Sequence, residues 1–479
     1  MPRRTKIVAT LGPMTDTPEA LDRILRAGVD MARINFSHGS AEEHLARIGR
    51  FRAAAEQLGK IAAVMADLPG PKLRAKLPQS RELKTGETIS FSLSNQPVHA
   101  DDIVITEPEI LADVRAGQRI LLDDGRLQLV ANSPGNGRLT ARVTDGGTLS
   151  PNKGINLPDT PLSISSVTDR DRAALVVAAR AKVDWVALSF VRSPDAAKEV
   201  RFAMDEVGLK CPVIAKMERP EAVNRAASIT RAFDGIMVAR GDLGVEIPLE
   251  RVPMAQKQLI AEAKAAGKPV ITATDMLDSM RTNPRPTRAE ASDVANAIFD
   301  GTDAVMLSGE TAIGQYPVES VACMARIAEE TESHLEKHGD RVFNLPFVVG
   351  EAVDDPLAQA ACELSAELNA AAIIVPTLSG RTAKLVARHR PWARIIATAP
   401  TPEILRGMAV VWGITPVPMT PSTSGSDRTS GAVRDAFTAG VVAVGERVIV
   451  LAGHPIAGGS RLPTIRVVRV GEGGEVSEP

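Results

Sequence analysis

Residues 212–242 read PVIAKMERPEAVNRAASITRAFDGIMVARGD, and this stretch decides the fold. It contains two short apolar runs, Pro212–Lys216 and Gly235–Ala239, separated by a segment of helical length. A strand, a helix and a second strand in this order indicate two parallel strands of one sheet. Charged residues follow both runs immediately: Lys216, Glu218, Arg240 and Asp242. We therefore expect two parallel strands that end in charged side chains.

The same strand–helix unit recurs on both sides of this stretch. The eight predicted strands are Lys6–Thr10, Met31–Phe36, Ile61–Asp67, Trp185–Ser189, Pro212–Lys216, Gly235–Ala239, Pro269–Thr272 and Ala304–Leu307. Without one long interruption the units occupy about 255 residues, the usual length of a (β/α)8 TIM barrel. The fold class predicted is α/β, with this barrel at residues 1–69 and 159–345. An open doubly wound sheet is the alternative.

The interruption, residues 70–158, has a different pattern. Short alternating runs such as Thr88–Leu93 are separated by turn signals such as Asp124–Gly125. This predicts a small all-β domain, a β-barrel, inserted after the third barrel strand. Barrel active sites lie among the loops that follow the strands, so the insert is placed to act as a lid.

Residues 346–479 are predicted to form a C-terminal open α/β domain. Its strands are expected at Ala372–Pro376, Arg394–Ala397, Thr415–Val417, Arg447–Ala452 and Thr464–Val470. Ser422–Ser430 is rich in Ser, Thr, Asp and Gly and is predicted to be a loop. The tail Gly471–Pro479 is predicted to fray.

Composition excludes several classes of function. The net charge of the 479 residues is −2 and the pI about 6.4, so nothing predicts a nucleic-acid or anionic-membrane partner. No apolar run is long enough to span a membrane. The three cysteines are far apart, which fits a reducing cytoplasm and excludes a disulfide framework.

Polar or charged residues follow every predicted barrel strand after the first. Lys216 and Glu218 are two apart on one strand and project to the same side. Glu218 and Asp242 suit Mg²⁺, which takes few protein oxygens and leaves places for water and substrate. A neighbouring lysine would neutralise charge on a phosphoryl group in transfer. A salt bridge among the three is the alternative.

The chain has no G-x-x-x-x-G-K-[ST] motif and no paired H-R-D and D-F-G motifs, which excludes P-loop and protein-kinase mechanisms. Five other stretches resemble the pyruvate kinase family, and the resemblance covers essentially the whole chain. They are Thr5–Pro13, Arg33–His38, Ala215–Glu218, Met237–Gly244 and Met280–Gly314.

The resemblance implies the architecture described above and an activity. Phosphoenolpyruvate and ADP would give pyruvate and ATP, the last step of glycolysis. It also implies a divalent metal, Mg²⁺ or Mn²⁺, a cytoplasmic homotetramer and a phosphorylated allosteric effector.

Individual roles follow from the same resemblance. Lys216, Thr274 and Arg33 would be catalytic, and Glu218 and Asp242 would hold the metal. The substrate would contact Arg33, Gly241, Asp242 and Thr274. Nucleotide binding would fall to Asn35, Phe36, Ser37, His38, Arg74 and Lys153.

Two positions depart from the family pattern. The monovalent-cation pocket would consist of Asn35, Ser37, Asp67 and the Leu68 carbonyl. Where K⁺-dependent members have a glutamate after this pocket, the chain has Lys72, whose ammonium could replace K⁺. We therefore expect activity without K⁺; the alternative is a solvated lysine at the lid hinge. Asp275 stands where a glutamine is common in the family. It could alter the proton relay or merely face water, and the sequence does not decide between the two.

A phosphate cradle is predicted between a strand and a helix of the C-terminal domain. It comprises Thr377, Leu378, Ser379, Gly380, Arg381 and Thr382. The resemblance implies that the effector binds here, and an ordinary capped helix start is the alternative. His44 and His389 have no partners at metal-ligand spacing and are predicted to be solvated.

Two other functions compete with phosphoryl transfer. One is an aldolase or lyase that handles pyruvate or phosphoenolpyruvate on a barrel with an acidic metal pair. The other is a regulatory relative that binds ligands without catalysis. The presence of Lys216, Glu218, Asp242 and Thr274 argues against both.

Overall fold

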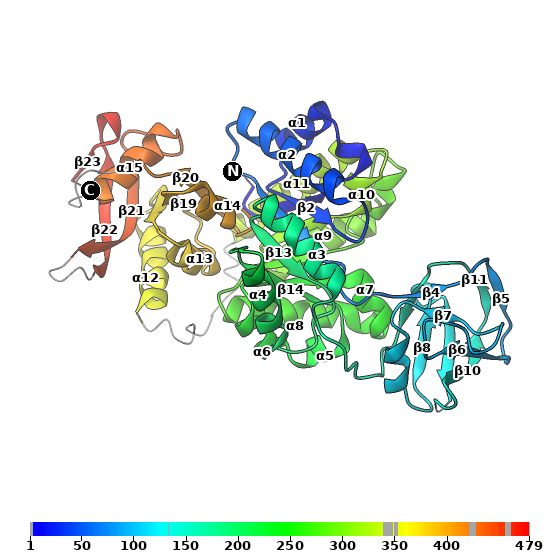
Figure 1. Ribbon diagram of the computed structural model, residues 1–479. Coiled ribbons are helices and arrows are strands. Elements are labelled where there is room, and N and C mark those ends of the chain that lie inside the picture. Colours follow the sequence, from blue (N-terminus) through cyan, green and yellow to red (C-terminus); the bar gives the residue numbers. More distant parts are fainter. Residues whose placement is uncertain are drawn as a thin grey trace.

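The computed structural model describes residues 3–132, 134–338, 348, 353–420, 428–455 and 461–478. Three units lie in a row (Figure 1). The barrel is in the middle, the β-rich insert is at one end, and the C-terminal unit is at the other. No helix within these described residues is both long enough and apolar enough to cross a membrane.

The central unit is a closed barrel of eight parallel strands, which confirms the predicted TIM barrel and excludes the open sheet. The strands are β1 (Lys6–Thr10), β2 (Met31–Asn35), β3 (Ala63–Asp67), β13 (Trp185–Leu188), β14 (Val213–Met217), β15 (Gly235–Ala239), β16 (Val270–Ala273) and β17 (Ala304–Leu307). β14 pairs with β15 and β2 with β3, in a register that sets Asn35 opposite Asp67. The carboxyl ends of all eight strands therefore meet at one mouth.

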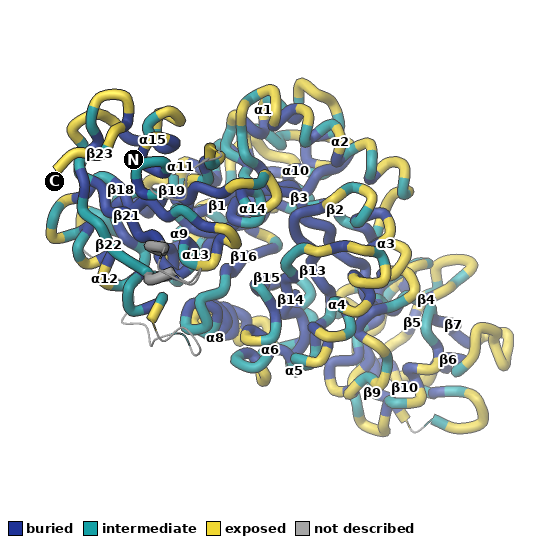
Figure 2. The backbone as a smooth tube through the Cα atoms, turned by 60° about the vertical axis from the view of Figure 1, so that its left-hand side comes forward, coloured by how far each residue is buried: buried dark blue, intermediate teal, exposed yellow. Residues whose placement is uncertain are grey.

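Helices cover the outside of the barrel. They are α1 (Pro18–Ala27), α2 (Ala41–Gln57), α3 (Asp169–Arg180), α4 (Ala196–Glu206), α5 (Pro220–Asn224), α6 (Ala226–Ala232), α7 (Arg240–Glu246), α8 (Val252–Ala265), α9 (Arg288–Asp300), α10 (Gly309–Ala312) and α11 (Pro317–His338). α2, α3 and α9 each begin with a capping box, such as Ser40 with Glu43. The barrel strands are buried, and exposure is concentrated on the outer helix faces and loops (Figure 2).

The insert is all-β, as predicted. Its strands are β4 (Leu73–Lys76), β5 (Arg81–Leu83), β6 (Thr88–Ser92), β7 (Val104–Ile105), β8 (Arg119–Leu122), β9 (Leu127–Ala131), β10 (Arg138–Asp145), β11 (Gly147–Leu149) and β12 (Gly154–Asn156). Seven of them form one sheet in the order β6-β10-β9-β8-β12-β4-β7. A bridge between Phe91 and Ile103 links the two edges of the sheet, so it bends back on itself around its own apolar core.

The C-terminal unit is an open α/β sheet. Its elements are α12 (Asp354–Glu367), β18 (Ala372–Pro376), α13 (Arg381–Arg388), β19 (Arg394–Ala399), α14 (Pro402–Gly407), β20 (Ile414–Pro418), α15 (Arg428–Thr438), β21 (Arg447–Pro455), β22 (Arg461–Val470) and β23 (Val476–Ser477). The strand order is β20-β19-β18-β21-β22-β23, parallel up to β21 and antiparallel beyond it.

The structure corrects two expectations for this unit. The tail does not fray, because β23 pairs with β22 and places Val476 opposite Val470. Residues 428–430, predicted as the end of the loop Ser422–Ser430, belong to α15 instead. Residues 421–427 lie outside the described residues. The predicted boundary between the barrel and the C-terminal domain, at residues 345 and 346, also lies outside them. The limits of the three units remain predictions.

Polar contacts join the C-terminal unit to the end of the barrel opposite the mouth. Arg406 Nε lies 2.7 Å from Asp184 Oδ1, and Arg390 Nη2 lies 3.2 Å from Asp303 Oδ1. Lys6 donates from Nζ to the carbonyl of Ile414 at 2.8 Å. The C-terminal unit therefore does not lie at the mouth, and the insert is the unit next to it.

Candidate active site

Lys216, on β14, is the centre of the mouth. Its Nζ lies 2.8 Å from Glu218 Oε1 and 3.2 Å from Asp67 Oδ1, and it donates to Ser189 Oγ at 2.8 Å. Burial by itself lowers the pKa of a lysine, but the charges of Asp67 and Glu218 outweigh it and raise the pKa of Lys216. Lys216 is therefore held as a buried cation.

The two carboxylates beside Lys216 differ in protonation tendency. Burial by itself raises the pKa of Asp67, but the positive charges of Lys216 and Arg33 outweigh burial and lower that pKa. Arg33 Nη2 lies 2.6 Å from Asp67 Oδ2. The pKa of Glu218 is raised, because burial and the negative charge of Asp242 outweigh Lys216. Glu218 is fully buried and accepts a hydrogen bond from the Phe190 amide at 2.7 Å.

Glu218 and Asp242 form the acidic pair predicted to hold a divalent metal. Among the residues that the structure describes, no group of three or more His, Cys, Asp or Glu side chains is close enough to hold a metal. Two carboxylates still fit Mg²⁺, which takes its remaining ligands from water and substrate. Glu218 Oε1 is ion-paired with the Lys216 ammonium at 2.8 Å, so a metal at this oxygen would share it with Lys216 or displace the ammonium.

Thr274 follows β16 in a conformation that side chains rarely adopt. Its φ is +70°, and that of Asp275 is +54°. Thr274 Oγ1 accepts a hydrogen bond from the Gly241 amide at 2.6 Å and donates to the Ala273 carbonyl at 2.6 Å. The Gly241 amide, expected to bind the substrate carboxylate, is therefore turned to Thr274. Burial raises the pKa of Asp275, with Asp278 adding to the effect.

Arg240 holds this unusual turn in place, although from the sequence it was named only as a charged residue after a strand and given no role. It donates to the carbonyls of Thr274 at 2.6 Å and Ala273 at 3.3 Å. Its Nη1 lies 2.6 Å from Asp293 Oδ1 on α9. The sequence signal that could have identified Arg240 is its position directly before the glycine of the Arg240-Gly241-Asp242 stretch.

The predicted nucleotide residues are divided between the barrel and the insert. Asn35 Oδ1 accepts from the Ser37 amide at 3.0 Å on the barrel side. On the insert, Arg74 donates to the Asn152 carbonyl at 2.9 Å, and Lys153 Nζ lies 2.7 Å from Asp123 Oδ1. Burial and then the charge of Arg74 lower the pKa of His38.

Phe36 and His44 pack together beneath this segment. Their rings stack with centroids 4.3 Å apart, and His44 is 2% exposed. The prediction of a solvated His44 was wrong, because its place on the inner face of α2 sets it against the loop after β2. Phe36 is buried as well, and its ring packs against His44. His389 was also predicted wrongly: its Nε2 lies 3.0 Å from Asp355 Oδ1.

The predicted monovalent-cation pocket is held together by Asp67 and Ser189. Ser189 Oγ donates to the Leu68 carbonyl at 2.7 Å, while the Asp67 carboxylate is paired with Lys216 and Arg33. Lys72 does not contact Asp67 in this arrangement. Its Nζ lies 3.6 Å from Asp242 Oδ1, with a side chain that is 34% exposed.

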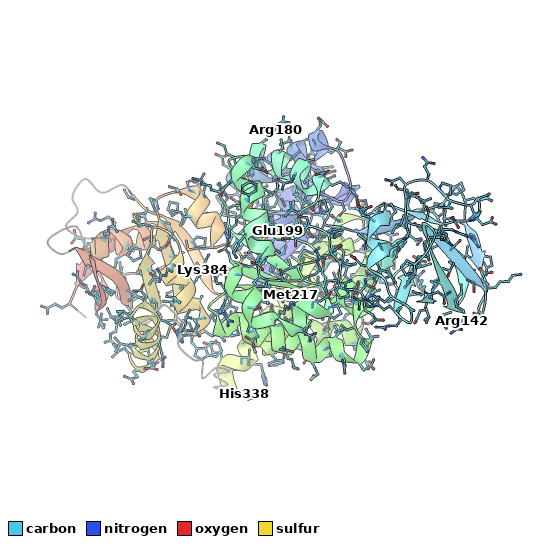
Figure 3. All side chains as sticks on the ribbon, turned by 60° about the horizontal axis from the view of Figure 1, so that its bottom comes forward. Arg142, Arg180, Glu199, Met217, His338 and Lys384 are labelled. Carbon is cyan, nitrogen blue, oxygen red and sulfur yellow. The ribbon has the colours of Figure 1, made fainter. Side chains whose placement is uncertain are left out.

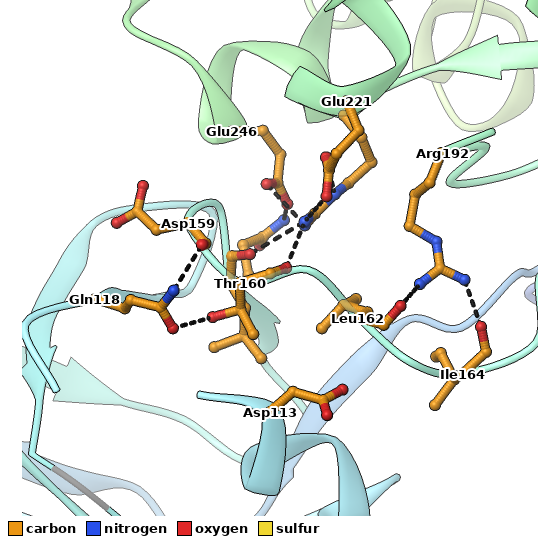
Figure 4. A network of polar contacts seen from close by, with 12 residues as sticks. Asp113, Gln118, Asp159, Thr160, Leu162, Ile164, Arg192, Glu221 and Glu246 are labelled. Atoms are coloured by element: carbon orange, nitrogen blue, oxygen red, sulfur yellow. Dashed lines mark hydrogen bonds and ion pairs between the residues drawn. The ribbon is translucent and has the colours of Figure 1, made fainter. Parts of the chain in front are cut away.

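A cleft separates the insert from the barrel beside Lys72. Its lining residues are Pro71, Lys72, Leu73, Ile155, Asn156, Leu157, Leu162, Phe190, Arg192, Arg219 and Glu246. Buried Arg219 Nη1 lies 2.9 Å from Glu246 Oε2, and Arg192 donates to the carbonyls of Leu162 and Ile164 (Figure 4). The chain that returns from the insert is thereby attached to the barrel.

The predicted phosphate cradle is a hydrogen-bonded turn before α13. Thr377 Oγ1 accepts from the amides of Gly380 at 2.9 Å and Ser379 at 3.4 Å, and Ser379 Oγ accepts from the Arg381 amide at 3.4 Å. Gly380 has φ +79°, and a Cβ there would lie 2.9 Å from Met408 Cγ, so glycine is required. Leu378 is exposed, and Thr382 lines a separate cavity of about 180 Å³.

The fold and mouth together define a (β/α)8-barrel enzyme with an inserted β unit and a C-terminal α/β unit. The family model for the pyruvate kinase barrel domain matches residues 2–321, and that for the pyruvate kinase alpha/beta domain matches residues 355–468. The pyruvate kinase of Geobacillus stearothermophilus is 42% identical over 475 residues, 98% of this chain and 81% of the relative. Pyruvate kinase 2 of Synechocystis sp. is 42% identical over 479 residues, 98% of this chain and 80% of the relative. The chain belongs to the pyruvate kinase family and is a phosphotransferase.

Proposed function

We propose that this chain transfers the phosphoryl group of phosphoenolpyruvate to ADP, giving pyruvate and ATP as the last step of glycolysis. The observation that carries the proposal is Lys216, a buried cation held between Asp67 and Glu218 at the barrel mouth. A cation in a site with little water stabilises charge far better than one in solvent.

The chemistry divides between the transferred group and the enolate it leaves. Lys216 would neutralise charge on the phosphoryl oxygens as the bond to the enol oxygen breaks and the bond to the ADP oxygen forms. Arg33 would contact the same phosphoryl group. The enolate carbon then takes a proton, and Thr274 is expected to belong to the path that delivers it.

Glu218 and Asp242 would hold a divalent metal, Mg²⁺ or Mn²⁺. When bound, the metal would neutralise substrate oxygens that Lys216 alone does not reach. The amides of Gly241 and Asp242 are proposed to bind the substrate carboxylate, after the Gly241 amide turns from Thr274.

A coupled assay of ATP formation tests the activity directly. We expect ATP to appear only when phosphoenolpyruvate, ADP and a divalent metal are all present, with one pyruvate for each ATP. Pyruvate release without ADP would instead favour a lyase. Binding of phosphoenolpyruvate without turnover would favour the non-catalytic relative.

Activity without added K⁺ is proposed from Lys72. Its ammonium, 3.6 Å from Asp242 Oδ1, brings a positive charge to the mouth. Lys72→Glu should make the enzyme depend on K⁺, while exposed Lys76→Glu on β4 should not. Assays in potassium-free buffer decide the proposal: a many-fold activation of the parent by K⁺ would contradict it.

A phosphorylated effector is proposed to bind the turn at Thr377–Thr382 and to lower the apparent KM for phosphoenolpyruvate. The support is the run of three adjacent amides, which would have to turn from their hydroxyl acceptors to the phosphate. Arg381→Ala should abolish the response, and exposed Arg142→Ala on the insert should retain it. An unchanged response in Arg381→Ala would place the effector elsewhere.

A homotetramer in the cytoplasm is proposed on the family resemblance. Leu249 and Met254 are 74% and 61% exposed near the start of α8, and such apolar side chains would be covered in an assembly. The three cysteines are free, as a reducing compartment requires. Light scattering after size exclusion measures the assembly, and a monomer at assay concentration would contradict it.

A further inference from the structure

A small cavity lies at the end of the barrel opposite the mouth, where α13 of the C-terminal unit faces the strand starts. We call it the basal cavity; its lining residues are Lys264, Gly267, Lys268, Pro269, Asp303, Lys384, Arg388, Arg390 and Val411. Figure 3 labels Lys384 at the boundary between the C-terminal unit and the barrel. The cavity measures about 10 Å³, enough for one occupant of about the size of water.

The lining of the basal cavity is strongly basic. Five of its side chains are lysine or arginine, and Asp303 is its one carboxylate. The Asp303 carboxylate is already engaged: Oδ1 accepts from the Trp412 amide at 3.2 Å, Oδ2 accepts from the Val270 amide at 3.0 Å, and Arg390 lies 3.2 Å away. The negative charge of Asp303 is therefore not available to neutralise the lysines of the cavity in addition.

Two of the cations have no carboxylate of their own. Within the part of the chain that the structure describes, neither Lys268 nor Lys384 forms an ion pair, and the Lys384 ammonium lies 5.4 Å from the Trp185 ring centroid. Arg388, by contrast, is paired with Asp355 on α12. The charge left over in the basal cavity is positive.

Arg390 adds a second, independent observation. Its Nε and Nη1 atoms are buried and receive no hydrogen-bond acceptor from the described residues, although its Nη2 donates to the Gly301 carbonyl at 2.7 Å. The Arg390 guanidinium lies over the Trp412 ring at 4.5 Å, which stabilises its charge but does not replace a hydrogen-bond acceptor, and a bound ion would supply one. Burial also lowers the pKa of Arg390 and of Lys384, and the nearby carboxylates, Asp303 and Glu332 for Arg390 and Asp234 for Lys384, offset this effect only in part.

We propose that the basal cavity binds one small inorganic anion of halide size, held by Lys384 and Arg390 from the C-terminal unit and by Lys268 from the barrel. The basic lining favours an anion over a cation, and the small space favours a halide over a phosphate ester. Because its ligands come from two units, the anion would join the C-terminal unit to the barrel.

Crystals grown in bromide in place of chloride test the site directly, because bromide scatters anomalously. We expect an anomalous peak within contact distance of the Lys384 ammonium. A water-like feature without anomalous signal at that position would overturn the proposal.

Thermal unfolding in chloride and in gluconate at equal ionic strength tests it in solution. Binding to the folded protein alone should raise the Tm by about 2 °C in chloride concentrations well above the Kd. Lys384→Met should abolish this difference and should not lower the Tm in gluconate, because it removes a half-buried cation that forms no ion pair within the described residues. Lys198→Met, at an exposed lysine of α4, is the matched control and should respond like the parent.

The two variants also separate this site from general salt effects and from anions at the mouth. Phosphate stabilises most proteins by exclusion from their surface and should stabilise the parent and Lys384→Met equally. A chloride response that survives in Lys384→Met would place the anion elsewhere and contradict the proposal. So would a Tm in gluconate that falls sharply in Lys384→Met, since that result would make Lys384 a structural cation.

Discussion

The two ends of the barrel bury charge in opposite ways. At the mouth, Lys216 and Arg33 are interleaved with Asp67 and Glu218, two cations with two carboxylates. At the base, the cavity gathers five basic side chains around Asp303. The pKa of Lys216 is raised, whereas that of Lys264, an equally buried lysine at the base, is lowered well below its usual value.

The difference lies in where the opposite charge comes from. Desolvation disfavours the charged form of both lysines; Asp67 and Glu218 reverse the effect at Lys216, whereas Asp303 does not reverse it at Lys264. The mouth therefore keeps its charge balanced before substrate arrives, and it can exchange one set of partners for another. The base leaves an excess that an external anion can neutralise. Four changes to the chain or its medium would break or sharpen this contrast.

Lys216→Met should have the largest effect. It removes the cation between two buried carboxylates, so the rate of ATP formation should fall by at least ~10³-fold. Stability should fall by about 3–5 kcal/mol, because Asp67 and Glu218 would be left buried with less compensation. A coupled assay and urea unfolding measure the two losses. Retention of most activity would overturn the role given to Lys216.

Glu218→Gln should come next. The neutral amide is a weaker metal ligand than the carboxylate, and it also removes the ion pair with Lys216. We expect the Mg²⁺ concentration for half-maximal rate to rise by roughly 100-fold. Metal titrations at saturating substrates measure this, with half-buried Glu221→Gln on α5 as the control. An unchanged metal requirement would remove Glu218 from the metal site.

Arg240→Met should have a smaller effect, through Thr274. Without the hydrogen bonds to the Ala273 and Thr274 carbonyls, the turn with positive φ should relax, and kcat should fall by about 10-fold. Exposed Arg288→Met on α9 provides the control. Because Arg240 acts by position, Thr274→Ser should become less costly in the Arg240→Met background than in the parent. Additive losses would argue against the coupling.

The smallest expected effect is a pH dependence at the base. The folded pKa of Lys264 is depressed below 10.5, so the unfolded chain binds more protons between that depressed pKa and about 10.5. Stability should therefore rise with pH across this window, by at most about 1.4 kcal/mol for each pH unit. Lys264→Met should flatten the rise in urea unfolding at several pH values in chloride-free buffer. Equal slopes in parent and variant would contradict a desolvated lysine.

The strand–helix alternation predicted the barrel well, because each strand must be apolar to be buried on both faces. Residues 235–239 and 304–307 were predicted with the same limits that the structure gives to β15 and β17. The mouth was also predictable, since parallel strands bring their carboxyl ends together. Periodicity did not show that β23 pairs with β22, because Val476 and Ser477 form too short a run to register as a strand.

Partners that come from distant segments were the least predictable feature. His44 was predicted to be solvated because it has no partner at metal-ligand spacing, but α2 places its ring against Phe36. Arg240 became important only once β16 had brought Thr274 beside it. The basal cavity has no motif at all: Lys268 and Lys384 are 116 residues apart in the numbering and meet only where the C-terminal unit docks.

By itself, the sequence determined the order of strands and helices, the three kinds of unit and the family, because hydrophobic period and local motifs are written along the chain. It also determined which chemical groups reach the mouth. Only the tertiary structure decided which charges are balanced. Whether a buried lysine is stabilised depends on carboxylates a few ångströms away in space, and neither Asp67 beside Lys216 nor the surplus cations beside Lys384 can be read from their neighbours in the chain.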